Sequence, residues 1–164
     1  FYEDMHRWAF HLQVYFLNSM FNQIKNIRAS KKTTIQDRTI YEDAYIFAAN
    51  LYKSKFLNER DYASYLSLFD SMLQHVDAPD LIIYLKADIP KLVKQIQKRG
   101  RNYENAIRIN YLQNLNDHYA DWMGNYDQGK KLVIDVNDID FVENIDDFSG
   151  IVNKIDTELF GLFN

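Results

Sequence analysis

The chain contains no cysteine, only two prolines and five glycines among its 164 residues. Without cysteine no disulfide can form, so nothing in the sequence indicates an oxidising compartment. No apolar run is long enough to cross a membrane, and no stretch has the pattern of a signal peptide. We therefore expect a cytoplasmic protein that has no membrane partner.

Positive charge is also in short supply. The 19 lysines and arginines are outnumbered by 23 acidic residues, which gives a net charge of −4 at neutral pH. A protein that binds the nucleic-acid backbone needs a basic surface, so we expect no nucleic-acid partner. A single nucleotide could still bind in a local basic pocket. The length suits one domain that needs neither disulfide nor metal to fold.

The hydrophobic pattern predicts an α/β protein with three short strands. β-branched or continuous apolar runs predict strands over residues 33–36, 81–85 and 131–135, and the second should be fully buried in a parallel sheet. Helical spacing predicts helices over 2–28, 41–52, 58–75, 109–126 and 141–159, with a further helix that begins at 88. Twelve tyrosines and eleven phenylalanines suit a helical core or a stacking pocket.

Asp37 and Arg38 follow the first predicted strand. Ligands of α/β proteins bind where a parallel strand ends and the next helix begins. A carboxylate at that point can hold a hydrated magnesium ion, and a guanidinium can meet phosphate oxygens as a rigid fork. Taken alone, the dipeptide is explained better as a surface ion pair.

Two further polar pairs lie on helical faces. Tyr2 and Gln13 share an otherwise apolar stripe of the first helix, and Asp43 and Phe47 are one turn apart on the next. Buried polar groups need hydrogen-bond partners, which a ligand could supply. The alternative is that Tyr2 caps the helix and Gln13 bonds to a neighbouring backbone group, and the residues alone favour this alternative.

Read together, these segments resemble the deoxynucleoside kinase family. Residues 37–47 are similar to its signature, Asp/Glu-Arg-Ser/Thr followed by Tyr, Asp and Ile-Phe. Residues 2–13 resemble its substrate helix, 99–104 its arginine lid, and 135–137 its late base-binding turn. The similarity covers nearly the whole chain in the same order.

The resemblance implies a parallel sheet of the P-loop kinase type and transfer of the γ-phosphoryl group of ATP to the 5′-hydroxyl of a deoxynucleoside, with Mg²⁺, in a homodimer. It also implies the site residues: Asp37 on magnesium; Arg38, Arg99 and Arg101 on the transferring phosphate; Tyr2 and Glu104 on the sugar 3′-hydroxyl; Gln13, Asp43 and Phe47 on the base; and Asp135, Val136 and Asn137 against the adenine of the donor.

The chain departs from many relatives at three positions where they carry arginine, here Met20, Ala44 and Gln95. These changes remove guanidiniums that help to read the base or to hold phosphate. The Glu42-Asp43 pair resembles bacterial members that prefer purine deoxynucleosides.

No Gly-x-x-x-x-Gly-Lys-Ser/Thr motif occurs in the 164 residues, although a kinase of this type needs such a loop to cradle phosphates. We therefore expect an N-terminally truncated chain, which lacks the first strands, the phosphate loop and the catalytic base, and which is inactive alone. Two alternatives stay open. One is a thymidylate-type nucleoside monophosphate kinase, and the other is a non-catalytic helical dimerisation domain.

Overall fold

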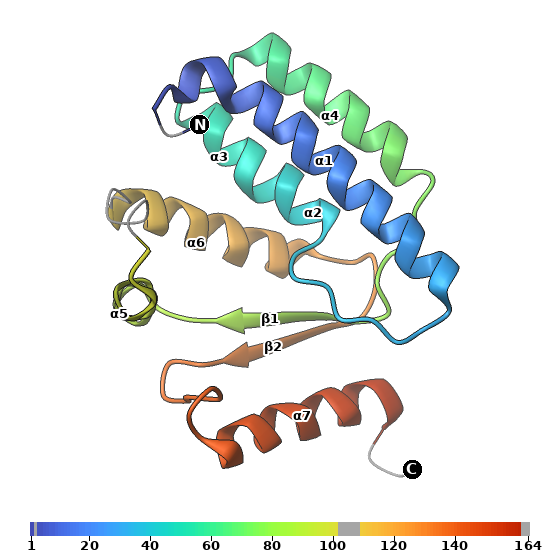
Figure 1. Ribbon diagram of the computed structural model, residues 1–164, viewed down its shortest axis with the longest axis vertical. Coiled ribbons are helices and arrows are strands. Elements are labelled where there is room, and N and C mark those ends of the chain that lie inside the picture. Colours follow the sequence, from blue (N-terminus) through green and yellow to red (C-terminus); the bar gives the residue numbers. More distant parts are fainter. Residues whose placement is uncertain (2, 102–108, 162–164) are drawn as a thin grey trace. The chain divides into compact units, whose positions relative to one another are not determined.

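The computed structural model describes residues 1, 3–101 and 109–161. Helices dominate, and the described strands form one parallel pair (Figure 1). The chain divides into two compact units. The helical unit comprises residues 1–77 and 117–122, and the sheet unit comprises residues 78–116 and 123–164. No described helix combines the length and the apolar character that a membrane crossing requires.

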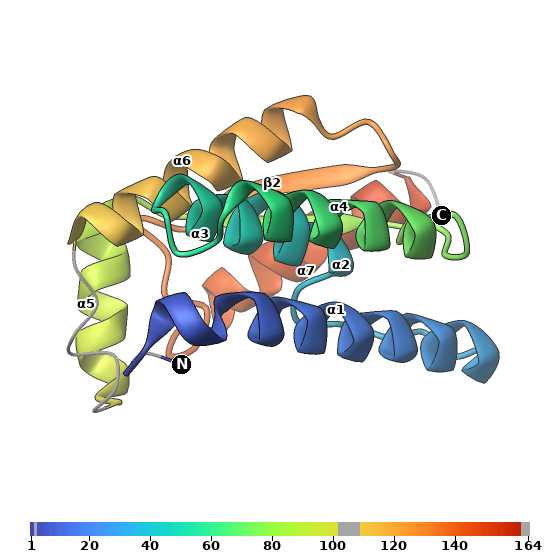
Figure 2. The ribbon, with the colours of Figure 1, turned by 90° about the horizontal axis from the view of Figure 1, so that it is seen from above.

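The helical unit begins with the long helix α1 (Met5–Ser30), where residues 2–28 were predicted. Asp4 caps it by accepting a hydrogen bond from the backbone N–H of Arg7. Because α1 buries an apolar stripe, it packs against helix α4 (Glu59–Leu73), and the two lie side by side in Figures 1 and 2. Leu17, Tyr65 and Phe69 are fully buried in the core of this unit.

The second predicted helix is continuous but changes its winding. It runs through α2 (Ile40–Glu42), the π-helical segment η1 (Asp43–Ala48) and α3 (Ala49–Lys53). A π-helix closes its hydrogen bonds five residues apart, and such segments occur frequently at functional sites. Asp43 and Phe47, predicted on one face of an ordinary helix, therefore both lie in a wider turn.

The strand predicted over residues 33–36 is wrong. This segment is irregular, and the side chain of Ile35 is 93% exposed. A strand needs a neighbour to pair its backbone N–H and C=O groups, and the sheet within the described residues contains two other segments only. Asp37 and Arg38 thus follow a loop.

The sheet unit is built on two strands, β1 (Ile82–Lys86) and β2 (Lys131–Asp135). They pair in parallel with Ile82 opposite Lys131, which confirms both predicted strands. Helix α7 (Ile145–Phe160) packs on β2, where Ile134, Val136 and Ile151 form the buried core. Helices α5 (Ile89–Arg99) and α6 (Ile109–Asn125) complete the described elements.

Two details of this unit differ from the prediction. The run 81–85 was expected to be fully buried, but Ile83 and Leu85 remain about two fifths exposed, because a pair of strands offers too few neighbours to cover every side chain. The last helix begins four residues later than predicted. Asn144 caps it by accepting from the N–H of Asp146, so the preceding residues form a turn.

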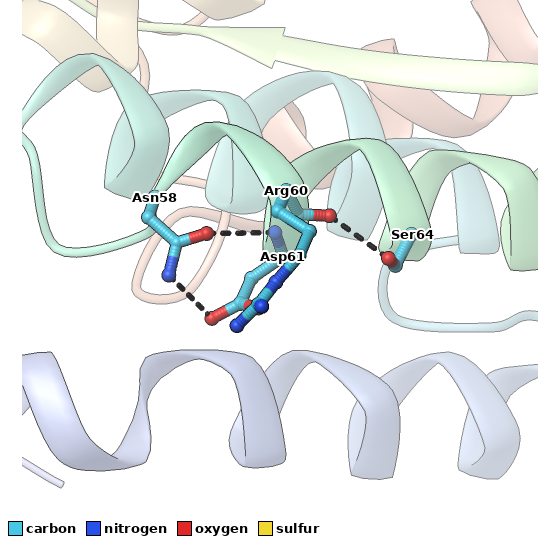
Figure 3. Close-up of polar contacts among 4 residues, drawn as sticks. All are labelled: Asn58, Arg60, Asp61 and Ser64. Carbon is cyan, nitrogen blue, oxygen red and sulfur yellow. Dashed lines mark hydrogen bonds and ion pairs between the residues drawn. The ribbon is translucent and has the colours of Figure 1, made fainter.

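The start of α4 is held by one asparagine (Figure 3). The Asn58 Oδ1 accepts a hydrogen bond from the backbone N–H of Asp61, and its Nδ2 donates to the Asp61 carboxylate, each at 2.8 Å. The Arg60 Nε lies 3.7 Å from Asp61 Oδ1, but the Arg60 side chain is exposed. The capping interaction therefore dominates the ion pair at this helix end.

Replacing Asn58 with alanine should lower the free energy of unfolding by about 1 kcal/mol, and hence the melting temperature by roughly 2–4 °C, because the first turn of α4 loses its cap. Thermal unfolding followed by circular dichroism measures this change. The matched control, Arg60→Ala, should leave the melting temperature almost unchanged, since an exposed ion pair contributes little. Equal effects of the two substitutions would contradict the assignment.

Candidate functional site

Arg38 adopts a backbone conformation that is unusual for its type. Its φ of 63° lies in the left-handed region, which costs a residue with a Cβ about 1 kcal/mol or more. Its guanidinium carbon lies 5.0 Å from the centre of the Phe47 ring, so the cation covers a face of this aromatic side chain. Strain of this kind at a polar residue is typical of functional sites.

A capping box fixes the residues that follow Arg38. The Thr39 N–H donates to the Glu42 Oε2 at 2.8 Å, the Thr39 hydroxyl bonds to the same oxygen, and the Tyr41 N–H donates to Thr39 Oγ1 at 3.2 Å. Burial raises the pKa of Glu42, while these bonds and the Arg38 charge oppose the rise. The Glu42 carboxylate is thus engaged with its own helix start.

Asp43 opens the π-helical segment and is only 1% exposed. Burial raises the pKa of Asp43 from 3.8 to about 6, with the Arg38 charge lowering it and the Glu42 charge raising it. Its Oδ2 atom is buried and accepts no hydrogen bond from any described residue. A buried carboxylate oxygen without a donor is costly, and a ligand could supply the donor.

Four further residues of the helical unit bury a polar atom in the same way, and the partly exposed His118, at Nε2, is one of them. Gln13 Oε1 on α1, both amide atoms of Asn50 on α3 and the Tyr65 hydroxyl on α4 have no hydrogen-bond partner among the residues that the structure describes. Helices α1 and α4 both contact η1, which carries Asp43. Sequence reasoning predicted roles for Gln13 and Asp43 but missed Asn50 and Tyr65, for which no sequence signal is evident.

Asp37 directly precedes Arg38 in the sequence, and its side chain is exposed. Within the described part of the chain no three acidic, histidine or cysteine side chains gather into a metal-binding cluster. A single exposed carboxylate still fits magnesium, which keeps several waters and takes one or two carboxylates together with substrate phosphates. Asp37 is the residue that would hold it.

The sheet unit contains the other predicted site residues. Asp135 is the last residue of β2, and the chain turns through Val136 and Asn137, where the Asp135 carboxylate accepts from the Asn137 N–H at 3.0 Å. Asn137 Oδ1 accepts from the Asp88 N–H at 2.9 Å, and the Val136 N–H donates to Lys86 O at 2.9 Å. The turn is therefore tied to the carboxyl end of β1.

The two arginines that were predicted to form a lid lie at the C-terminal end of α5. Arg99 is its last residue and Arg101 follows Gly100, whose φ of 65° ends the helix; both arginine side chains are exposed. The Nζ of Lys98, the residue before Arg99, lies 3.3 Å from Glu143 Oε1. The structure thus brings the two arginines to one helix end. The predicted sugar contacts Tyr2 and Glu104 lie outside the described residues.

The buried Asp43 makes stability depend on pH. Its pKa is higher in the folded chain, so the folded state binds more protons between about pH 4 and 6, and stability falls as the pH rises through this range. A shift of this size corresponds to roughly 3 kcal/mol. Asp43→Asn should therefore melt on the order of 10 °C higher at pH 7.5, and the difference should vanish near pH 4.

Thermal melts of both proteins from pH 4 to 8 measure this effect. Asp37→Asn is the matched control, and it should leave the melting temperature nearly unchanged because this carboxylate is exposed. If wild type and Asp43→Asn have the same melting temperature at pH 7.5, the Asp43 carboxylate is not destabilising, and another interaction offsets the cost of its burial.

Comparison with known proteins identifies the family. The family model described as "Deoxynucleoside kinase" matches residues 1–160. Deoxyadenosine/deoxycytidine kinase of Bacillus subtilis is 33% identical over 157 residues, which cover 94% of this chain and 72% of that protein. Deoxyadenosine kinase of Dictyostelium discoideum is 40% identical over 123 residues, which cover 75% of this chain and 50% of that protein.

Solved structures agree with the sequence matches. The structure of deoxyadenosine kinase from M. mycoides with bound dATP superposes with a TM-score of 0.79 at 28% identity, and the match covers 94% of this chain and 78% of that one. The structure of that enzyme with products dCMP and a flexible dCDP bound gives a TM-score of 0.81 at 27% identity. The predicted α/β kinase fold is confirmed, and the chain belongs to the deoxynucleoside kinase family.

Proposed function

We propose that the protein containing these residues transfers the γ-phosphoryl group of ATP to the 5′-hydroxyl of a deoxynucleoside. Membership of the family supports a kinase that acts on deoxynucleosides. The observation that carries the proposal for this chain is Asp43, whose buried carboxylate oxygen has no donor in the described structure and whose charge is opposed by Arg38, which in turn lies over the Phe47 ring. This combination suits a polar, planar ligand.

The nucleoside would bind to the helical unit. Gln13 offers a donor and an acceptor side by side and would pair with the edge of the base, while Asp43 would accept or share a hydrogen on it. Phe47 would stack on the base. Tyr2 and Glu104 would contact the sugar 3′-hydroxyl. The Glu42-Asp43 pair leads us to propose a purine base.

Phosphoryl transfer needs positioning and charge stabilisation more than covalent chemistry. Arg38 would steady the 5′-oxygen and the transferring group, and Arg99 and Arg101 would neutralise the charge on the phosphates. Mg²⁺, held by Asp37 through water, would neutralise phosphate oxygens. The turn at 135–137, held by its own hydrogen bonds, would lie against the adenine of ATP.

Residues 1–164 contain no phosphate-cradling loop, so we propose that they are inactive alone. We further propose a homodimer in the cytoplasm.

A thymidylate-type enzyme would need a basic group for the phosphate of its acceptor. The candidate for that role, Arg7, is exposed and has its guanidinium carbon 4.9 Å from the centre of the Trp8 ring on the same helix.

The test is Arg38→Ala in the longest product of the gene that contains residues 1–164, assayed with ATP, Mg²⁺ and a panel of deoxynucleosides. Its kcat should fall by about a hundredfold or more, because the developing charge loses its partner. Arg38→Gly should lose as much activity, although glycine relieves the left-handed backbone and this variant should be about 1 kcal/mol more stable than Arg38→Ala. Near-normal turnover of either variant would refute the role of Arg38.

A further inference from the structure

Tyr65 occupies a buried position at which phenylalanine would also fit. It lies on α4, its side chain is fully buried, and its hydroxyl has no hydrogen-bond partner among the described residues. Phenylalanine would fill nearly the same volume without burying a polar atom. The proposed phosphoryl transfer gives this hydroxyl no role.

The Tyr65 hydroxyl and the Asp43 carboxylate are complementary. Helix α4 contacts η1, and the side chains of Tyr65 and Asp43 are both buried in the helical unit. Burial raises the pKa of Tyr65, and the Asp43 charge and Tyr62 add to this effect. The hydroxyl is a donor that lacks an acceptor, and Asp43 Oδ2 is an acceptor that lacks a donor, as far as the structure describes the chain. Both atoms are buried.

We propose that Tyr65 is a positioning residue, whose hydroxyl donates a hydrogen bond to Asp43 Oδ2 when the nucleoside binds and so turns Oδ1 toward the base. This inference rests on the proposed function and adds a residue to it. The end of an aspartate side chain rotates broadly about its last bond, and a phenol hydroxyl rotates about its C–O bond. A base that bonds to Oδ1 would fix the rotation of the aspartate carboxylate, and the Tyr65 hydroxyl would then donate to Oδ2.

A neutral donor is suited to this task. Arg38 and Glu42 are the charged groups that act on Asp43, and their effects on it are opposite. A hydroxyl stabilises the carboxylate without cancelling its charge, so Asp43 keeps its ability to accept from the base. Of the other buried polar atoms that lack a partner among the described residues, Gln13 Oε1 is an acceptor and cannot donate to the carboxylate, and Asn50 Nδ2 is an amide donor on α3.

The experiment compares Tyr65→Phe with Tyr62→Phe in the longest product of the gene that contains residues 1–164. Tyr62 lies one turn earlier on α4, where its ring stacks on Tyr52 with centroids 4.5 Å apart. Its effect on the pKa of Tyr65 is smaller than that of Asp43, so it controls for loss of a neighbouring hydroxyl. Calorimetry would measure binding of deoxyadenosine, deoxyguanosine and deoxycytidine. Tyr65→Phe should weaken binding of the preferred nucleoside about tenfold to a hundredfold, and Tyr62→Phe should leave it unchanged.

The pH profile separates positioning from packing. Loss of a hydrogen bond to the carboxylate disfavours its ionised form, so the pH midpoint of nucleoside affinity should move upward in Tyr65→Phe and stay in place in Tyr62→Phe. In a double-mutant cycle, Asp43→Ala should remove most of the additional effect of Tyr65→Phe. Additive losses of affinity would overturn the proposal.

The remaining outcomes are distinct. Unchanged affinity in Tyr65→Phe, with wild type binding normally, would overturn this inference alone. Absence of nucleoside binding by the wild type would overturn the proposed function and the inference with it. The ligand-free melting temperature of Tyr65→Phe should be no lower than that of wild type, and a large fall would mean that the hydroxyl is already bonded without ligand, which would also overturn the inference.

Discussion

The burial of a carboxylate in the core of the helical unit is the constraint on which the rest of its site depends. A charged group inside a protein must be paired or must shift toward its neutral form. Asp43 shows both effects. Burial raises its pKa to about 6, toward the neutral form, while the charge of Arg38 opposes the rise. The left-handed backbone of Arg38 and the Thr39–Glu42 capping box provide the local geometry around it.

The two units differ in how their polar residues are satisfied. In the sheet unit, the turn at 135–137 is closed by hydrogen bonds from Asn137, Val136 and Asp88, so its backbone is already fixed. In the helical unit, Gln13 and Asp43 each bury a polar oxygen that no described group satisfies. A ligand gains most where it supplies missing hydrogen bonds, so selectivity for the nucleoside is expected to come from the helical unit.

Much of the fold could be predicted because its long helices bury apolar stripes and strands β1 and β2 are short apolar runs. The segment 33–36 could not, because β-branched residues form a strand only where another strand pairs with them, and Ile35 lies exposed instead. The capping box was readable as Thr39-x-x-Glu42 and was missed, while Asp43 and Gln13 were found through the family resemblance. The π-helical winding and the buried hydroxyl of Tyr65 depend on tertiary packing, which no local pattern encodes.

The contact between Arg38 and Phe47 would couple the binding of phosphate to the binding of the base. The guanidinium covers one face of the ring, which the base would have to share or to avoid. A cation over an aromatic ring contributes about 0.5–1 kcal/mol at an exposed site, whereas a hydrogen bond between charged groups contributes about 1.5–3 kcal/mol. Phosphate oxygens should therefore draw Arg38 away from Phe47 and leave that face to the base. The donor phosphate and the nucleoside base should then assist each other's binding, because Arg38 would leave the Phe47 ring for the phosphate.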